Sequence, residues 1–242
     1  MEALKNEFSL YIRNNYDTTN DNIIRKYYHS YRVMELCRII AKSEGMNEND
    51  IEIASYMGLL HDIGRFEQWK LYSTYDDLKS IDHADLGIKI LFDYKKIKKF
   101  YLLKENYDEI YDAIRYHNKL EIPNSLSEHN KRMCKVLRDA DKLDILYLIS
   151  IKAIKTEESN EEISLKVKES FLNKKSINKK DVKNPNDSIL LRFAFIFDLN
   201  YKSSFWYLKQ YKLIDKIYDN LTNKEMFKPY FEMVKNYIDN YK

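Results

Sequence analysis

The chain has 242 residues, of which 44% are apolar and 33% charged, and its 41 Lys and Arg against 38 Asp and Glu give a net charge of +3. This composition is typical of a globular protein and excludes an intrinsically disordered chain. Only four Gly and three Pro are present, too few turn-forming residues for a β-sandwich or barrel, so we expect an all-α fold. The basic residues are spread among acidic ones rather than gathered in one stripe, so we expect no nucleic acid polymer as partner.

The two cysteines, Cys37 and Cys134, are far apart and form no CxxC pair, which indicates neither a disulfide framework nor a zinc ribbon. The opening residues, MEALKNEFSLYIRNNYD, lack the basic start and apolar run of a signal peptide. No stretch approaches the roughly 18 apolar residues of a membrane-spanning helix. We therefore expect a cytoplasmic protein that does not interact with membranes.

Helical periodicity begins in the segment 28–41, where apolar residues recur at spacings of three and four and His29 lies on the same face. A second helix is expected to begin near Asn47, which can cap it, and its inner stripe ends in His61. Gly64 is a plausible stop for this helix, which would place His61 and Asp62 in its last turn.

Residues 65–82 are polar and aromatic and predict a connection with at most a short helix. The next helix opens at 80–82, and the first residue of its otherwise apolar face is His83. A fourth helix carries Ile110, Ala113, Ile114 and His117 on one face, and Pro123 marks the loop after it. The fifth runs from about 131 to 150, with Asp141 on its apolar stripe.

Residues 173–187 are rich in Asn and Lys and lack apolar periodicity, so this segment is the best candidate for a linker. The following segment, 189–199, is apolar nearly all round and is expected to be buried. We expect a single domain over 1–242, with a core at about 20–150 and a helical extension, 151–242, packed on it.

Six side chains on predicted apolar faces are candidate metal ligands: His29, His61, Asp62, His83, His117 and Asp141. A buried, unpaired carboxylate costs several kcal/mol, so a set of His and Asp in one core needs a compensating charge, which a divalent cation supplies. Imidazole and carboxylate suit zinc, manganese, iron, nickel or cobalt, and the lack of thiolates argues against a structural zinc site.

Each of these residues also has a purely structural interpretation. A lone histidine such as His83 or His117 is more often a hydrogen-bonded core residue than a ligand. Asp139 and Asp144 compete with Asp141, although spacing selects Asp141 for the core. The adjacent pair His61 and Asp62 is harder to explain by packing, because a charged residue at the end of a buried stripe has no ordinary packing role. His129 lies in a polar loop, and we assign it no role.

The motifs around these residues resemble the HD superfamily of metal-dependent phosphohydrolases. HSYRV, HDIGR, DHADLG, IRYHN and DADKLD follow, in order, the H…HD…H…H…D pattern of its two-metal branch, over roughly residues 27–150. The resemblance implies a bundle of helices around one ion held by His29, His61, Asp62 and Asp141. A second ion would be held by His83 and His117, with Asp62 shared.

Two subgroups of the superfamily are disfavoured. Tyr116 precedes His117, so the double histidine of the cyclic dinucleotide phosphodiesterases is absent, as is their GYP signature. Alarmone hydrolases generally lack the second pair of histidines, which this chain has.

The resemblance implies that two ions activate a water molecule at the shared Asp62 to attack phosphorus in a small phosphorylated substrate, for which we expect a nucleotide. Arg65 is the first candidate to meet phosphoryl charge and Lys142 the second, while Arg32 and Asn118 are weaker candidates for binding phosphate. A structural ion pair is the competing interpretation of each cation. Two other functions stay open: a diiron oxygenase with the same ligands, and a nucleotide-sensing module with little turnover.

Overall fold

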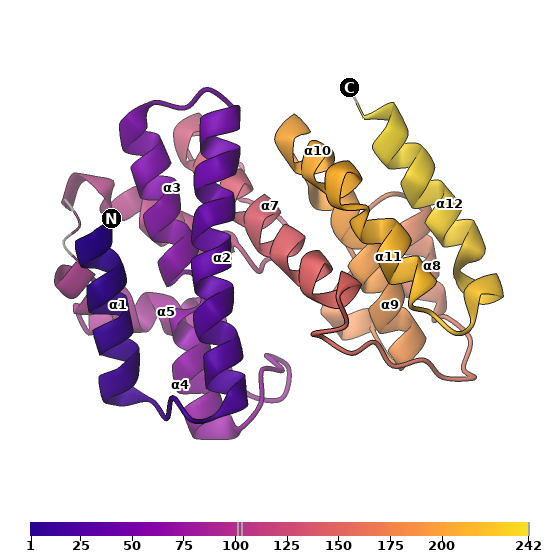
Figure 1. Cartoon of the computed structure of the whole chain (residues 1–242), viewed down its shortest axis with the longest axis horizontal. Helices are drawn as coiled ribbons and strands as arrows, with labels where there is room; N and C mark the ends of the chain where they lie inside the picture. Colours follow the sequence, from indigo (N-terminus) through magenta and orange to yellow (C-terminus); the bar gives the residue numbers. More distant parts are fainter. Residues whose placement is uncertain (101, 103, 242) are drawn as a thin grey trace. The chain divides into compact units, whose positions relative to one another are not determined.

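The computed structural model describes residues 1–100, 102 and 104–241, and all regular secondary structure in them is helical, as the all-α prediction requires. The chain divides into two compact units, residues 1–140 and 141–242 (Figure 1). Helix α7 (Glu128–Ser150) begins in the first unit and ends in the second. That the whole chain forms one domain stays a prediction. Every helix of the described part is too short or too polar to cross a membrane.

The first unit is built from α1–α6, three short helical turns and the start of α7 (Figure 1). Their bounds are α1 (Glu2–Asn15), α2 (Asp21–Ser43), α3 (Glu48–Leu60), α4 (Ile63–Tyr72), α5 (His83–Ile88), η1 (Lys89–Asp93), η2 (Lys96–Phe100), η3 (Lys104–Asn106) and α6 (Tyr107–Tyr116).

Helices α2 and α3 pack side by side along their lengths (Figure 1). Gly58 makes this close approach possible, because a Cβ atom there would lie 2.6 Å from Cα of Met34. Asn47 begins α3 as predicted, since its side chain accepts a hydrogen bond from N of Asp50 at 2.9 Å. The packing brings the end of α3, with His61, to the His29 face of α2.

The prediction that Gly64 stops a helix is wrong, and the predicted connection at 65–82, with at most a short helix, is a ten-residue helix to Tyr72 followed by a connection. Helix α3 ends at Leu60, so His61 and Asp62 form the turn after it and not its last helical turn, and α4 begins at Ile63. Gly64 lies inside α4 because that helix packs closely on α5: a Cβ atom at Gly64 would collide with the carbonyl oxygen of His83. Gly64 therefore allows α4 and α5 to pack closely and does not end a helix.

The remaining helices of this unit agree with their predicted places. Asp82 caps α5, accepting hydrogen bonds from N of Ala84 at 2.9 Å and N of Asp85 at 3.1 Å. The predicted inner faces of α5 and α6 are buried, His83 and Ile110 included.

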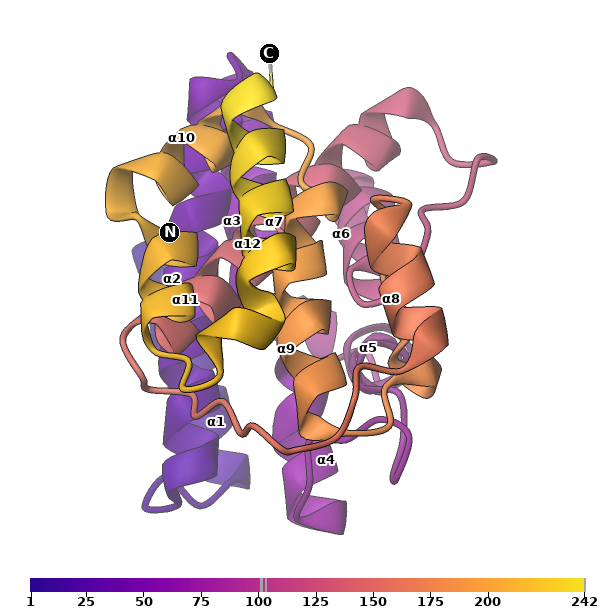
Figure 2. The ribbon, with the colours of Figure 1, turned by 90° about the vertical axis from the view of Figure 1, so that its right-hand side faces the viewer.

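The second unit holds the rest of α7 and the helices that follow it, and α12 packs against α9 and α11 (Figure 2). Their bounds are α8 (Leu165–Leu172), η4 (Lys179–Asp181), α9 (Pro185–Ala194), η5 (Phe195–Asp198), α10 (Lys202–Tyr211), α11 (Leu213–Asp219) and α12 (Lys224–Asn240). The segment 189–199 is buried except for a few positions, as predicted.

Residues 173–187 do not separate two units, as their composition suggested, but join α8 to α9, which contact each other. Asp187 anchors this segment: it is fully buried and accepts hydrogen bonds from N of Ser164 at 2.8 Å and from Oγ of Ser164 at 2.6 Å. Its carboxylate also completes a capping box with Asn184. These local hydrogen bonds hold a segment that has little apolar periodicity.

Candidate metal centre

Asp62 lies at the junction of α3 and α4, and its side chain is only 2% exposed. Its two oxygens face different histidines. Oδ2 lies 3.4 Å from Nε2 of His29 and 3.5 Å from Nε2 of His61, whereas Oδ1 lies 3.5 Å from Nε2 of His83 and 4.0 Å from Nε2 of His117. One carboxylate therefore stands between two pairs of imidazoles, an arrangement that suits a ligand shared by two ions.

His61 and His117 present Nε2 to this carboxylate because their Nδ1 is hydrogen-bonded on the opposite side of the ring. Nδ1 of His61 lies 2.8 Å from the carbonyl oxygen of Gly58, and Nδ1 of His117 lies 2.7 Å from that of Ile114. A carbonyl oxygen can only accept, so Nδ1 carries the hydrogen and Nε2 keeps its lone pair for a ligand. Hydrogen bonds of this type orient metal-binding histidines.

His83 is held in the same way by a side chain. Its Nδ1 lies 2.8 Å from Oδ2 of Asp77, and its Nε2 lies 3.0 Å from Nε2 of His117. Burial and the neighbouring Arg65 guanidinium lower the pKa of His83 to about 4, although the Asp77 hydrogen bond opposes this. His83 is thus neutral at pH 7, the form in which imidazole binds a metal.

Two groups of ligand atoms lie within 4.8 Å of one another in this unit: His29, His61 and Asp62, and Asp62, His83 and His117. All five side chains are buried. Nitrogen and carboxylate oxygen donors of this kind fit zinc, iron, manganese, nickel or cobalt. Five of the six predicted ligands are therefore brought together, and their binding of an ion stays a prediction.

The sixth predicted ligand, Asp141, lies on α7 at the first position of the second unit and is half-buried, whereas Asp139 and Asp144 are buried, so its selection by spacing as the core residue of the three is wrong. Its role as a ligand stays a prediction. Lys142 belongs to the same unit, where its Nζ forms a 2.6 Å ion pair with Oδ2 of Asp198. This pairing is the structural alternative to a catalytic role, which stays a prediction for Lys142.

The buried Arg65 is engaged by the protein itself. Its Nη1 donates to the carbonyl oxygen of Tyr75 at 2.6 Å, to Oδ1 of Asp77 at 2.7 Å and to Oε1 of Gln68 at 2.7 Å. Its Nε lies 3.7 Å from Oδ1 of Asp62. Arg65 thus places a positive charge beside Asp62 and ties the loop after α4 to the centre, and its role in meeting phosphoryl charge stays a prediction.

The two weaker candidates lie in different surroundings. Arg32 is half-buried on α2. Asn118 donates through Nδ2 to Oδ1 and Oδ2 of Asp82, both at 3.1 Å, while its Oδ1 is buried without a hydrogen-bond partner. Burial raises the pKa of Asp82. Hydrogen bonds from Lys119, N of Asp85 and Asn118 lower it by more than burial raises it, so the pKa is about 2. A role for Arg32 or Asn118 in phosphate binding stays a prediction.

Sequence reasoning missed two residues beside the centre. Lys26 approaches Asp62 closely, with Nζ 2.6 Å from Oδ2. Burial raises the pKa of Asp62, yet the Lys26 ammonium, His61 and His29 together hold it well below its usual range. Lys26 precedes His29 by three residues on α2, and this spacing could have revealed it. Asp77 carries no comparable signal, because the path of its loop brings it to His83.

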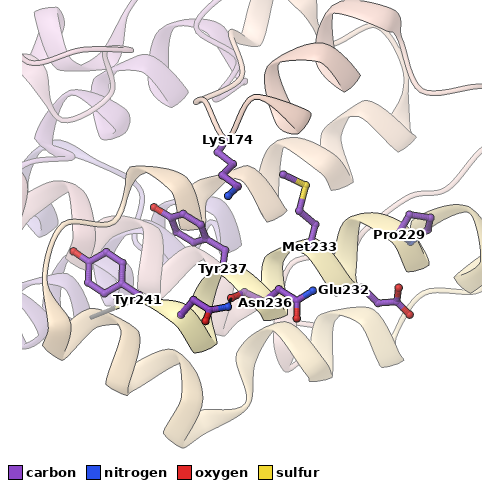
Figure 3. A pocket seen from close by; sticks show the side chains of 8 residues that line it. Lys174, Pro229, Glu232, Met233, Asn236, Tyr237 and Tyr241 are labelled. Atoms are coloured by element: carbon purple, nitrogen blue, oxygen red, sulfur yellow. Dashed lines mark hydrogen bonds between the residues drawn. The ribbon is translucent and has the colours of Figure 1, made fainter.

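A surface pocket of about 670 Å³ lies in the second unit, mainly along α12 (Figure 3). Figure 3 shows Lys174 across from Tyr237, and Met233 and Glu232 farther along the helix. None of the predicted site residues lines this pocket.

Comparison with known proteins agrees with the His and Asp pattern. The family model for the HD domain matches residues 27–146. No curated protein and no solved structure gives a significant match to the chain. The matched segment includes all six of the predicted ligands, from His29 to Asp141. Residues 27–146 are therefore an HD domain, and through this domain the chain belongs to the HD superfamily.

Proposed function

We propose that the chain hydrolyses a phosphomonoester or phosphodiester of a small substrate, for which a nucleotide is the first candidate, in the cytoplasm. One observation carries the proposal: the two oxygens of the buried Asp62 face separate pairs of histidines. The Lys26 ammonium balances the charge of this carboxylate, but only a metal ion would also use the imidazole lone pairs that face it.

Each ligand has a place in this proposal. His29, His61 and Asp141 hold the first ion, His83 and His117 hold the second, and Asp62 belongs to both. When bound, such a pair of divalent ions lowers the pKa of a coordinated water toward neutrality and offsets charge on phosphoryl oxygens.

The surrounding residues keep this arrangement in place. The carbonyl oxygens of Gly58 and Ile114 fix the protonated nitrogen of His61 and His117, and Asp77 does the same for His83. Arg65 offers positive charge beside Asp62 for the developing charge on phosphate. Lys142, Arg32 and Asn118 are further candidates for this role.

Metal analysis and turnover together test the proposal. Protein purified without chelator is analysed for metals, and phosphate release is then measured over a panel of nucleotides with the metal found. We expect release by the wild type and its loss in Asp62→Ala. Asp93→Ala serves as the matched control, because Asp93 is an exposed aspartate of the same unit.

Two other outcomes would replace hydrolysis as the function. An iron-specific protein that consumes oxygen and gives a mixed-valent paramagnetic signal would be an oxygenase that uses the same ligand set. Tight nucleotide binding with no product over hours would instead indicate a sensing module.

A further inference from the structure

Lys26 forms an ion pair with the buried Asp62. Its Nζ is 2.6 Å from Oδ2, the same oxygen that faces His29 and His61. The Lys26 side chain is 17% exposed, against 2% for Asp62. The ammonium therefore binds an oxygen of the proposed metal ligand while keeping a route to solvent.

Two further cations lie beside Lys26 around one aromatic ring, and one of them, Arg65, also pairs with Asp77. Nζ of Lys26 lies 5.7 Å from the centre of the Tyr75 ring, and Cζ of Arg25 and Cζ of Arg65 each lie 5.8 Å from it. The ring itself is anchored, because its hydroxyl donates to the carbonyl oxygen of Asn22 at 2.8 Å and the Tyr75 carbonyl accepts from Arg65 at 2.6 Å. Asp77 balances the charge of Arg65, so Lys26 and Arg25 are the cations of this group that can attract an anion once Lys26 leaves Asp62.

A divalent cation and the Lys26 ammonium cannot both use Oδ2 of Asp62 without strong repulsion between like charges at short range. Metal binding thus has to displace the ammonium, which lowers the affinity of the protein for the metal. An anion that binds the displaced ammonium and the ion together removes the repulsion. By linkage, such an anion must raise the affinity for the metal, and the metal must raise the affinity for the anion by the same factor.

We propose that Lys26 couples metal binding to phosphate binding: its ammonium neutralises Asp62 in the metal-free protein and binds a phosphoryl oxygen once Asp62 holds a metal. The ligand class is a phosphate group, either free or as part of a phosphate ester. The inference rests on the proposed function through the assignment of Asp62 as a metal ligand.

Calorimetric titration of Mn²⁺ into the chelator-treated full-length protein tests the coupling, with and without inorganic phosphate and with chloride of equal ionic strength as the salt control. We expect phosphate to raise the Mn²⁺ affinity of the wild type about fivefold or more, in the usual range of coupling between sites. Lys26→Met should bind Mn²⁺ more tightly than the wild type in chloride and lose the effect of phosphate. Lys26→Arg, which keeps the charge, should retain that effect.

Lys70→Met is the matched control. Lys70 is an exposed lysine whose Nζ lies 5.6 Å from the ring of Tyr16, so it has the same kind of lysine–tyrosine contact without Asp62. It should behave as the wild type. Thermal unfolding identifies a variant that does not fold, and Lys26→Gln, which keeps a hydrogen-bond donor, replaces Lys26→Met in that case.

Equal phosphate effects in the wild type and in the uncharged Lys26 variant would overturn the inference, as would weaker Mn²⁺ binding by that variant in chloride. A protein that releases phosphate from substrates but shows no coupling would keep the proposed function and lose this inference. Coupling of Mn²⁺ and phosphate binding without any hydrolysis would keep this inference and contradict the proposed function.

Discussion

Nε2 of His83 lies 3.0 Å from Nε2 of His117 inside the first unit. Each ring directs its Nδ1 hydrogen outward, His83 to Asp77 and His117 to the carbonyl oxygen of Ile114. In this protonation state two lone pairs face each other in a buried site, which is unfavourable until a cation lies near both.

Metal binding should therefore stabilise the protein. We expect Mn²⁺ or Zn²⁺ to raise the Tm of chelator-treated protein, since a ligand at 100 times its Kd adds about 2.7 kcal/mol to the free energy of unfolding. The rise should be smaller in His117→Ala, which lacks one of the facing imidazoles. His129→Ala is the control, because His129 is 43% exposed and lies outside the ligand groups. Equal shifts in all three proteins, measured by differential scanning calorimetry, would contradict this prediction.

Asp77 positions His83 and should affect one ion more than the other. Asp77→Asn keeps the shape of the side chain but weakens its hydrogen bond to His83 and its 2.7 Å ion pair with Arg65. Loss of such outer partners typically lowers metal affinity about 10–100-fold. We expect this loss for the weaker of two binding steps in a Zn²⁺ titration, with the other step unchanged. Asp93→Asn should leave both steps intact, and an unaltered titration in Asp77→Asn would remove its positioning role.

The close packing of α2 on α3 predicts a contrast between two glycines. Gly58→Ala places a Cβ atom 2.6 Å from the backbone of Met34, so the helices must separate, at a cost of about 1–3 kcal/mol. Gly87→Ala meets its nearest neighbours at 3.6 Å and should be neutral or stabilising, by up to about 1 kcal/mol from helix propensity. Urea unfolding measures both changes. A loss in Gly87→Ala as large as that in Gly58→Ala would refute the packing argument.

The depressed pKa of His83 makes the stability of the metal-free protein depend on pH. The folded pKa is about 4 and the ordinary value is 6.5, so between these values the unfolded chain binds more protons than the folded one. The free energy of unfolding should therefore rise with pH across this window and fall as the solution is acidified from pH 6.5 to 4. His83→Gln, which cannot be protonated, should show a shallower slope in denaturant titrations at successive pH values. If His83→Gln and the wild type show the same slope, the pH dependence of stability arises from groups other than His83.

The sequence was sufficient to place the candidate histidines because each lies on a helix, or directly after one, whose apolar period is clear. His29 follows the stripe of α2, His61 ends that of α3, and His83 begins that of α5, so the 3.6-residue repeat predicts that these side chains point inward. Motif order then supplied the grouping of the ligands.

What the sequence did not reveal depends on contacts between distant segments. A glycine at position 64 is typical of a helix end, but here glycine is required because the backbone of α5 packs directly against it. Lys26 and Asp77 reach the centre only because α2 and the loop after α4 pass beside Asp62 and His83. The polar composition of 173–187 gave no sign that Asp187 is buried and that its hydrogen bonds fix the segment in place.

The most direct test of the account is the metal content of the chain purified without chelator, measured by mass spectrometry alongside Asp62→Ala and Asp93→Ala. A shared carboxylate between two imidazole pairs predicts close to two divalent ions per chain in the wild type and in Asp93→Ala, and a loss of both in Asp62→Ala. A folded wild-type protein that takes up no divalent ion, or an Asp62→Ala variant that retains the full metal content, would contradict it.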